Sequence, residues 1–196
     1  FTRHWESYKG DSSFDGVATV PSGFGLEGSE SVAYVNYHNG VSSLKSKNLT
    51  ASSLNDLSGK SLVAFAGARQ IIPGLDGAVN SFSSYSEKTD QIKQSRLLFS
   101  GRTDAVLGDA LIFFNYNDVL QKESANKKLG FDPHQEVSFS PIFDQTPYHM
   151  VFRDSALNDD FNRCFKELDE AGKIQEINKS FVSKYQSLVG SGYLGF

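Results

Sequence analysis

The sequence predicts an α/β protein of two lobes, with one lobe inserted into the other. Strand-like and helix-like segments alternate through the middle of the chain, which is the pattern of βαβ units on a mostly parallel sheet. Extended segments at 31–44 and 148–152 bracket this block, as expected where a chain enters and leaves an inserted lobe. We therefore expect lobe 1 at 1–36 and 148–196, lobe 2 at 39–144, and crossings near 35–38 and 144–148.

The inserted block contains short apolar runs that are typical of buried strands. The run SLVAF at 61–65 ends just before Gly67, and the run DAVL at 104–107 ends at Gly108-Asp109. In a parallel sheet the carboxyl ends of such strands are where ligands bind. The remaining expected elements are a helix at 73–82, a strand at 83–87, and helices at 90–100 and 110–121.

Two helices are expected to close the chain. Apolar residues recur at helical spacing on either side of Gly172, which is a helix-stop signal. Both stripes are expected to face a hydrophobic core. Their residues are Leu157, Phe161, Phe165 and Leu168 in the first helix, and Ile174, Ile177, Phe181, Tyr185 and Leu188 in the second.

The composition excludes several classes of protein. Hydrophobic residues make up 39% of the 196 residues and charged residues 21%, which is enough apolar material for a packed core. The net charge of −4 argues against nucleic-acid binding, which needs clustered Lys and Arg. The single cysteine, Cys164, excludes an intramolecular disulfide framework and a Cys-rich zinc module. The sequence has no apolar run of about 18 residues that could span a bilayer.

No cofactor or metal is expected. The four histidines lack metal-ligand spacing, and the glycines at 23–28 lack the final spacing and the βα context of a dinucleotide-binding loop. A Ser–His–Asp set is not visible from sequence alone, since such triads are not local in sequence. Nothing in the pattern favours an enzyme.

Five motifs run in a common order along nearly the whole chain. They are FDGVA at 14–18, SVAY at 31–34, LNDLSGK at 54–60, SGRTDAVLGD at 100–109, and the terminal pair FNRCFKEL at 161–168 with AGKIQEI at 171–177. Together they resemble the periplasmic solute-binding proteins of the amino-acid receptor type (bacterial extracellular solute-binding family 3). One departure is Ala33, which stands where the family usually has proline.

The resemblance implies the type II periplasmic-binding-protein fold, with the N-terminal portion of the first lobe missing from this sequence. It implies a monomeric, exported, non-enzymatic receptor that captures a small polar solute between its lobes and delivers it to the membrane permease of an ABC transporter. Two other functions stay open. One is the ligand-sensing domain of a membrane signalling protein, and the other is a dehydratase-like enzyme on the same scaffold.

The resemblance also assigns ligand-binding residues. Asp109 falls at the position where the family binds the ammonium group of an amino acid, and Ser22 stands near a hydroxyl donor. The family's carboxylate-binding Arg has no counterpart at 21–33, so Arg69 becomes the cationic candidate. The remaining candidates lie at or just after strand ends: Val20, Phe65 and Gly67.

Each charged candidate also has a structural alternative. Asp109 directly precedes the expected helix at 110–121, where it would serve as an N-cap, and this role is compatible with ligand contact. Arg69 lies before a helix, where backbone N–H groups favour an anion. Its alternative is a solvated or ion-paired surface side chain.

Overall fold

The computed structural model describes residues 3–190 and residue 193, and it divides into two compact units. Among these residues, unit 1 comprises 3–37 and 145–184, and unit 2 comprises 38–144 together with 185–190 and Tyr193. The assignment of the last segment to lobe 1 is therefore corrected. Its physical reason is local packing: the Tyr185 hydroxyl donates to Asp118 Oδ2 at 2.8 Å, and the Tyr185 ring stacks on Phe114.

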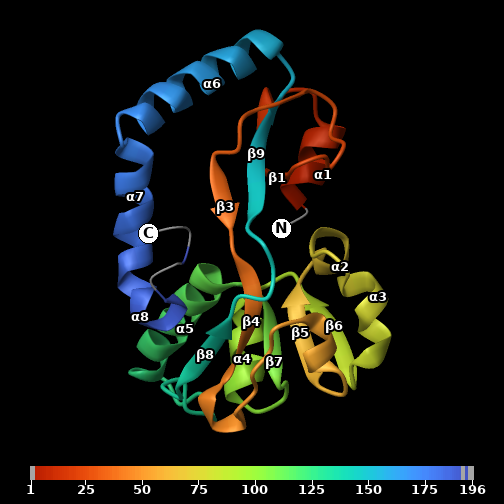
Figure 1. Cartoon of the computed structure of the whole chain (residues 1–196), viewed down its shortest axis with the longest axis vertical. Coiled ribbons are helices and arrows are strands. Elements are labelled where there is room, and N and C mark those ends of the chain that lie inside the picture. The colour runs from red at the N-terminus through yellow and green to blue at the C-terminus, as the bar shows by residue number, and fades with distance from the viewer. Residues whose placement is uncertain (1–2, 191–192, 194–196) are drawn as a thin grey trace. The chain divides into compact units, whose positions relative to one another are not determined.

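Unit 1 is built on a small antiparallel sheet whose central strand is β9 (Thr146–Phe152). It pairs with β1 (Gly16–Pro21), β2 (Ser29–Glu30) and β3 (Val35–Tyr37) (Figure 1). Helix α1 (Arg3–Gly10) packs on β1 through its two buried aromatic residues, Trp5 and Tyr8. The Trp5 indole N–H donates to the Thr19 carbonyl at 3.2 Å.

The two expected terminal helices are α6 (Ser155–Glu170) and α7 (Lys173–Val182). Asp154 caps α6 by accepting the N–H of Ala156, and Gly172 separates the helices at φ +74°, where a side chain would be strained.

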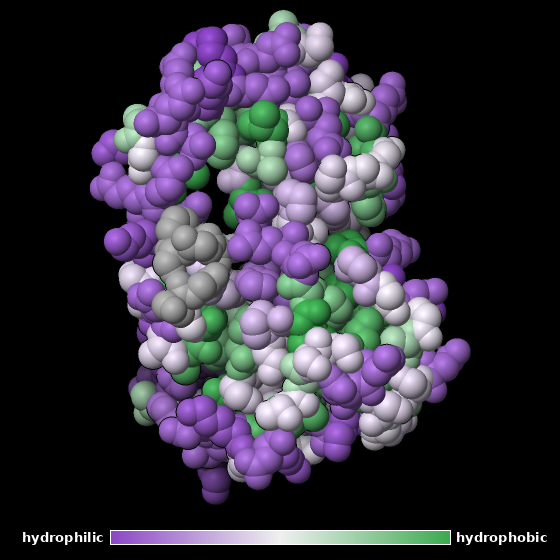
Figure 2. All heavy atoms as spheres, viewed as in Figure 1, coloured by the Kyte–Doolittle hydropathy of each residue, from purple (hydrophilic) through white to green (hydrophobic). Residues whose placement is uncertain are grey.

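The expectation that both apolar stripes face a core is wrong for their exposed members, whereas Tyr185 of the second stripe is buried. The exposed fractions are 41% for Leu157, 49% for Leu168, 54% for Ile177, 69% for Phe181 and 42% for Leu188. The Phe161 ring contacts the Phe152 ring of β9 at a tilted angle, with 5.4 Å between centroids, and meets the Tyr34 ring edge-on. Figure 2 shows hydrophobic residues of unit 1 exposed beside the hydrophilic outer side of α6.

Unit 2 contains a mixed sheet in the order β6-β5-β7-β4-β8. Strand β5 is parallel to both of its neighbours, as expected for βαβ units, whereas β4 is antiparallel to β7 and β8. The strands are β4 (Asn39–Leu44), β5 (Ser61–Phe65), β6 (Ser84–Lys88), β7 (Ala105–Asp109) and β8 (Val137–Ser140).

Helices α4 (Ile92–Phe99) and α5 (Ala110–Ser124) contact each other and strands β4 and β7. The expected helix at 73–82 is shorter and consists of α3 (Leu75–Ala78) followed by the 3-10 helix η3 (Val79–Ser81), and the short helix α2 (Ala68–Ile71) precedes it. Pro73 and Gly74 separate α2 from α3, because Pro73 has no N–H to donate and Gly74 adopts φ +75°. Short helices complete the unit: η1 (Lys45–Lys47), η2 (Leu54–Leu57), and α8 (Gln186–Val189), which follows η4 (Ser183–Tyr185).

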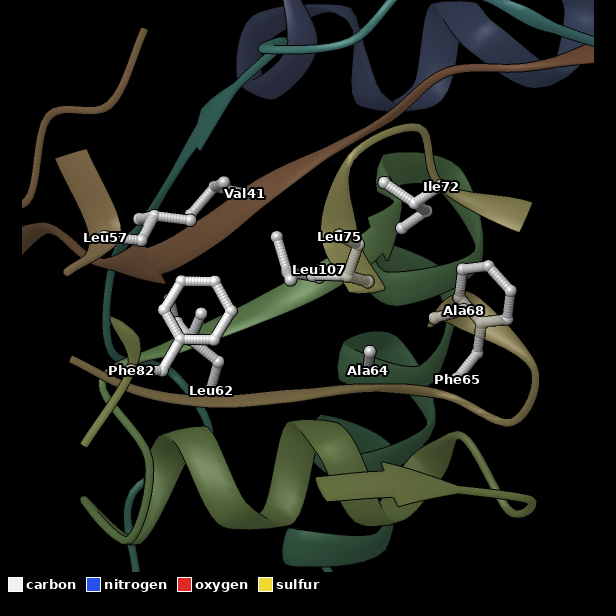
Figure 3. Packing of buried hydrophobic residues seen from close by; sticks show 11 residues of the cluster. Val41, Leu57, Leu62, Ala64, Phe65, Ala68, Ile72, Leu75, Phe82 and Leu107 are labelled. Carbon is white, nitrogen blue, oxygen red and sulfur yellow. The ribbon is translucent and has the colours of Figure 1, made fainter. Parts of the chain in front are cut away.

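The core of unit 2 lies between one face of its sheet and the segments η2, α2 and α3 (Figure 3). Side chains alternate across a strand, so Leu62 and Ala64 enter this cluster while Val63 and Val106 are buried on the opposite face. Burial on both faces explains why the strands read as continuous apolar runs. The cluster contains Val41, Leu57, Leu62, Ala64, Phe65, Ala68, Ile72, Leu75, Phe82, Ala105 and Leu107.

Candidate functional site

Asp109 is the last residue of β7 and the N-cap of α5. The N-cap is the structural role that the sequence predicted for it. Its backbone is extended, at φ −69° and ψ 133°, and its Oδ1 accepts the N–H of Ile112 at 3.0 Å. Its Oδ2 accepts the backbone N–H of His38 at 2.9 Å and the hydroxyl of Tyr193 at 2.8 Å. The strand end and the helix start therefore position the carboxylate together.

Burial dominates the electrostatics of Asp109. The residue is 8% exposed, and removal from water raises the pKa of its carboxyl group above the ordinary value. The N–H groups of Ile112 and His38 and the Tyr193 hydroxyl act in the opposite direction, with smaller effect. A buried carboxylate with a raised pKa gains from a positive partner, because such a partner would offset the cost of burying its charge.

Aromatic rings surround the Tyr193 hydroxyl that reaches Asp109. The Tyr193 ring stacks on the His38 imidazole with 5.3 Å between centroids and an angle of 27°. The Phe139 ring meets both rings nearly edge-on, with 6.2 Å between centroids in each case. Tyr193 is 2% exposed, so this aromatic cluster covers the carboxylate from one side.

The loop after β5 offers two backbone donors, and a side chain of the same unit already occupies them. Gly67 adopts φ +87° at the N-cap of α2. Its N–H donates to Glu87 Oε2 at 2.7 Å, while the N–H of Arg69 donates to Glu87 Oε1 at 3.0 Å. The Tyr85 hydroxyl donates to Oε1 as well, at 2.8 Å. The anion favoured at this helix start is thus the Glu87 carboxylate.

The Arg69 side chain forms an ion pair with Asp76. Its Nε and Nη2 both lie near Asp76 Oδ1, at 2.7 and 2.6 Å, and both side chains are at least half exposed. This is the ion-paired surface arrangement considered as the alternative for Arg69. Contact between Arg69 and a ligand stays a prediction.

The other candidates differ in exposure. Val20 is buried in unit 1, and Phe65 is buried in the unit 2 core beside Ala68. Ser22 is exposed in unit 1, where its hydroxyl donates to Glu30 Oε1 at 3.0 Å. Within unit 2 the structure thus places Asp109 and Gly67 at the ends of the neighbouring strands β7 and β5.

Sequence reasoning missed Glu87, His38 and Tyr193. Glu87 lies in a half-buried strand and could have been noticed as a charged residue near a strand end, but its link to the loop after β5 depends on tertiary structure. His38 acts through its backbone N–H, which any residue type except proline supplies. Tyr193 stands 84 residues from Asp109 and belongs to no motif.

Unit 1 carries a groove of its own, of about 460 Å³. It lies between the 31–34 segment and α6, where the Asn162 side-chain oxygen accepts the N–H of Val32 at 2.9 Å. Arg163, Lys166 and Asp169 line this groove together with apolar side chains, so its charge favours no one class of ligand. Its lining residues are Val32, Ala33, Asn162, Arg163, Phe165, Lys166 and Asp169.

Over residues 3–190 and 193, no group of His, Cys, Asp and Glu side chains is arranged to hold a metal ion. No helix in this part of the chain is both long enough and apolar enough to cross a membrane.

No protein-family model matches this chain, and no curated protein does. Solved structures are similar to it at low identity. One is an ABC uptake transporter substrate-binding protein from Streptococcus pneumoniae with bound histidine, with TM-score 0.65 and 20% identity, covering 92% of this chain and 72% of that one. Another is a histidine kinase sensor domain with similarity to periplasmic binding proteins, with TM-score 0.67 and 13% identity, covering 92% and 75%.

A third similar structure is the ancestral amino acid-binding protein AncCDT-1, described as a precursor of cyclohexadienyl dehydratase. Its TM-score is 0.66 at 15% identity, covering 91% of this chain and 74% of that one. The chain thus spans about three quarters of each of these proteins. The strand order of unit 2, its insertion between two segments of unit 1, and these likenesses agree with the motif resemblance. The chain has the two-lobed α/β fold of the type II periplasmic binding proteins.

Proposed function

We propose that this protein captures a small polar solute that carries an ammonium group, such as an amino acid, and that Asp109 accepts that group. The observation that carries the proposal is a buried carboxylate at the carboxyl end of β7, where ligands bind in open α/β sheets. The main-chain N–H groups of Ile112 and His38 fix its orientation, and the Tyr193 hydroxyl donates to it as well.

The proposed set of ligand contacts also includes Arg69, Ser22, Phe65, Gly67 and Val20. Of these, Gly67 and Arg69 follow β5, next to the strand that ends at Asp109. For Arg69 to bind a carboxylate through Nε and Nη2, its guanidinium must leave Asp76, which costs little because both side chains are well exposed.

The proposed role is binding without chemical conversion, as an extracytoplasmic monomer that delivers its solute to the membrane permease of an ABC transporter. The similar protein from Streptococcus pneumoniae serves an ABC uptake transporter, which supports this role.

The test compares two carboxylates that cap helices. A thermal-shift screen of the standard amino acids and 1,4-diaminobutane selects a ligand, and calorimetry then measures its affinity. Asp109→Asn removes the charge beside the ammonium group, so the affinity falls about tenfold to a hundredfold. Asp154→Asn, at the N-cap of α6, is the control and leaves the affinity unchanged. Equal affinities in both variants contradict the proposal, provided that both melt like the parent chain.

Ligand sensing is the second candidate function, favoured by the likeness to a histidine kinase sensor domain. The two functions differ in what the loaded protein acts on. A transport receptor stimulates ATP hydrolysis by its permease in reconstituted vesicles, and a sensory domain does not. The AncCDT-1 likeness suggests a further assay: chemical conversion of the selected ligand on incubation with the protein would contradict binding without catalysis.

A further inference from the structure

Among the described residues, Asp109 accepts hydrogen bonds from Ile112 at Oδ1 and from His38 and Tyr193 at Oδ2. A carboxylate oxygen offers about two acceptor positions, so both positions of Oδ2 are occupied. An ammonium group that binds Oδ2 must therefore replace one of its two donors.

Only one of these donors can leave without disturbing the fold. The Ile112 N–H belongs to the first turn of α5, and His38 directly precedes β4. The Tyr193 hydroxyl, in contrast, reaches Asp109 through a side chain that lies in no strand of the sheet. Its departure breaks no strand pairing.

The neighbouring polar position involves more hydrogen bonds. The Glu87 carboxylate accepts from the N–H groups of Gly67 and Arg69 and from the Tyr85 hydroxyl. Moving that carboxylate away would break all three bonds, whereas the departure of the Tyr193 hydroxyl breaks one hydrogen bond to Asp109. The position at Asp109 is therefore the more easily vacated of the two.

Tyr193 imitates part of an ammonium group. It donates a hydrogen bond to Oδ2 but brings no charge, since burial and the neighbouring Asp109 carboxylate hold the Tyr193 pKa well above its ordinary value. A charged donor forms a stronger bond to a carboxylate than a neutral donor does. An ammonium group would supply both the hydrogen bond and the missing charge.

We propose that the Tyr193 hydroxyl is an internal competitor for the solute's ammonium group, so that solute binds at Asp109 only when the Tyr193 side chain leaves it. This inference rests on the proposed function and adds its regulation. The apparent affinity is then the intrinsic affinity reduced by the fraction of molecules in which Tyr193 is displaced. The aromatic contacts with His38 and Phe139 and the bond to Asp109 set that fraction.

The decisive variant is Tyr193→Phe in the full chain. It keeps the ring but removes the hydroxyl. In the state in which residue 193 lies over Asp109, the buried carboxylate then lacks one hydrogen-bond donor. This state becomes less stable, so the affinity for the amino acid or diamine selected by the thermal-shift screen rises about tenfold or more. Tyr193→Ala, which also removes the ring, binds at least as tightly as Tyr193→Phe.

Tyr185→Phe is the matched control. It makes the same chemical change in the same C-terminal segment of unit 2, but the Tyr185 hydroxyl donates to Asp118 rather than to Asp109. Its affinity for the selected compound equals that of the parent chain.

The outcomes separate this inference from the proposed function. Equal affinity in the parent and Tyr193→Phe chains overturns the competition and leaves solute binding intact. Weaker binding in Tyr193→Phe also overturns it, because the hydroxyl would then be a ligand contact. If no compound of the panel binds the parent chain or either Tyr193 variant, the proposed function fails, and the competition fails with it.

Discussion

Unit 2 closes its hydrophobic core, whereas unit 1 leaves much of the apolar surface of α6 and α7 exposed among the residues described. In unit 2, Leu62 and Leu107 lie within a cluster that strands and short helices cover on all sides. In unit 1, Ile177 and Phe181 are more than half exposed. Both regions show clear helical or strand periodicity in the sequence. The difference teaches that periodicity predicts which residues share a face, while burial depends on what else reaches that face.

The largest expected effect on stability is in the hydrophobic core of unit 2. Leu107 is completely buried in the unit 2 cluster, so Leu107→Ala creates a cavity and lowers the free energy of unfolding by about 3 kcal/mol. Leu168→Ala makes the same change on the exposed face of α6 and costs less than about 1 kcal/mol. Urea unfolding followed by circular dichroism measures both losses. Similar losses in the two variants would break the comparison.

An intermediate effect is expected at Asp104, which ties β7 to β5. Its Oδ2 accepts the backbone N–H and the hydroxyl of Ser61, at 2.8 and 2.7 Å. We expect Asp104→Asn to lower the stability of unit 2 by about 1–2 kcal/mol at neutral pH, since hydrogen bonds to a charged group are stronger than neutral ones.

The pH dependence of this effect has a definite sign. The bonds from Ser61, led by the backbone N–H, hold the pKa of Asp104 below its ordinary value of 3.8. The stabilisation is therefore complete above pH 3.8 and is lost as the pH falls through the lower pKa of the folded state. Denaturant unfolding at several pH values measures the gap between parent and variant. A gap that stays constant into strong acid would contradict the ionic origin of the bond.

The smallest effect is expected on the exposed face of unit 1. Phe181 is 69% exposed, so Phe181→Ser changes the free energy of unfolding by less than about 0.5 kcal/mol, as for other surface substitutions. Phe113→Ser, in the buried part of α5, is the contrasting control and costs several kcal/mol by the cavity and polar-burial terms. A core-like loss at Phe181 would mean that its face is covered in solution.

Local patterns predicted most of the elements. The apolar runs at 61–65 and 104–107 form β5 and β7, and the helices expected at 90–100 and 110–121 form α4 and α5 with small shifts at their ends. Errors arose where a tertiary contact or backbone chemistry prevailed. The helix expected from Pro73 begins only after Gly74, which adopts a positive φ, and Tyr185 continued a helical stripe while packing in unit 2.

The candidate site was predictable only in part. Asp109 could be identified because a carboxylate between a buried strand and a helix has few possible roles, and the N-cap role is confirmed. Its hydrogen bonds from His38 and Tyr193 could not be predicted, since those contacts join segments far apart in the sequence. The same holds for Glu87, whose bonds to Gly67 and Arg69 arise from parallel pairing of β6 with β5.

The insertion of unit 2 between the strands of unit 1 fixes an order of events during synthesis. Strand β1 emerges from the ribosome early, yet its partner β9 follows the whole sheet of unit 2, since Gly16 pairs with Phe152. The five strands of unit 2 are complete once β8 has been made, so this sheet can form while β1 still waits. An unpaired strand is a template for association with other chains. Strand β1 therefore remains such a template from its emergence until β9 has been made, even after the sheet of unit 2 is complete.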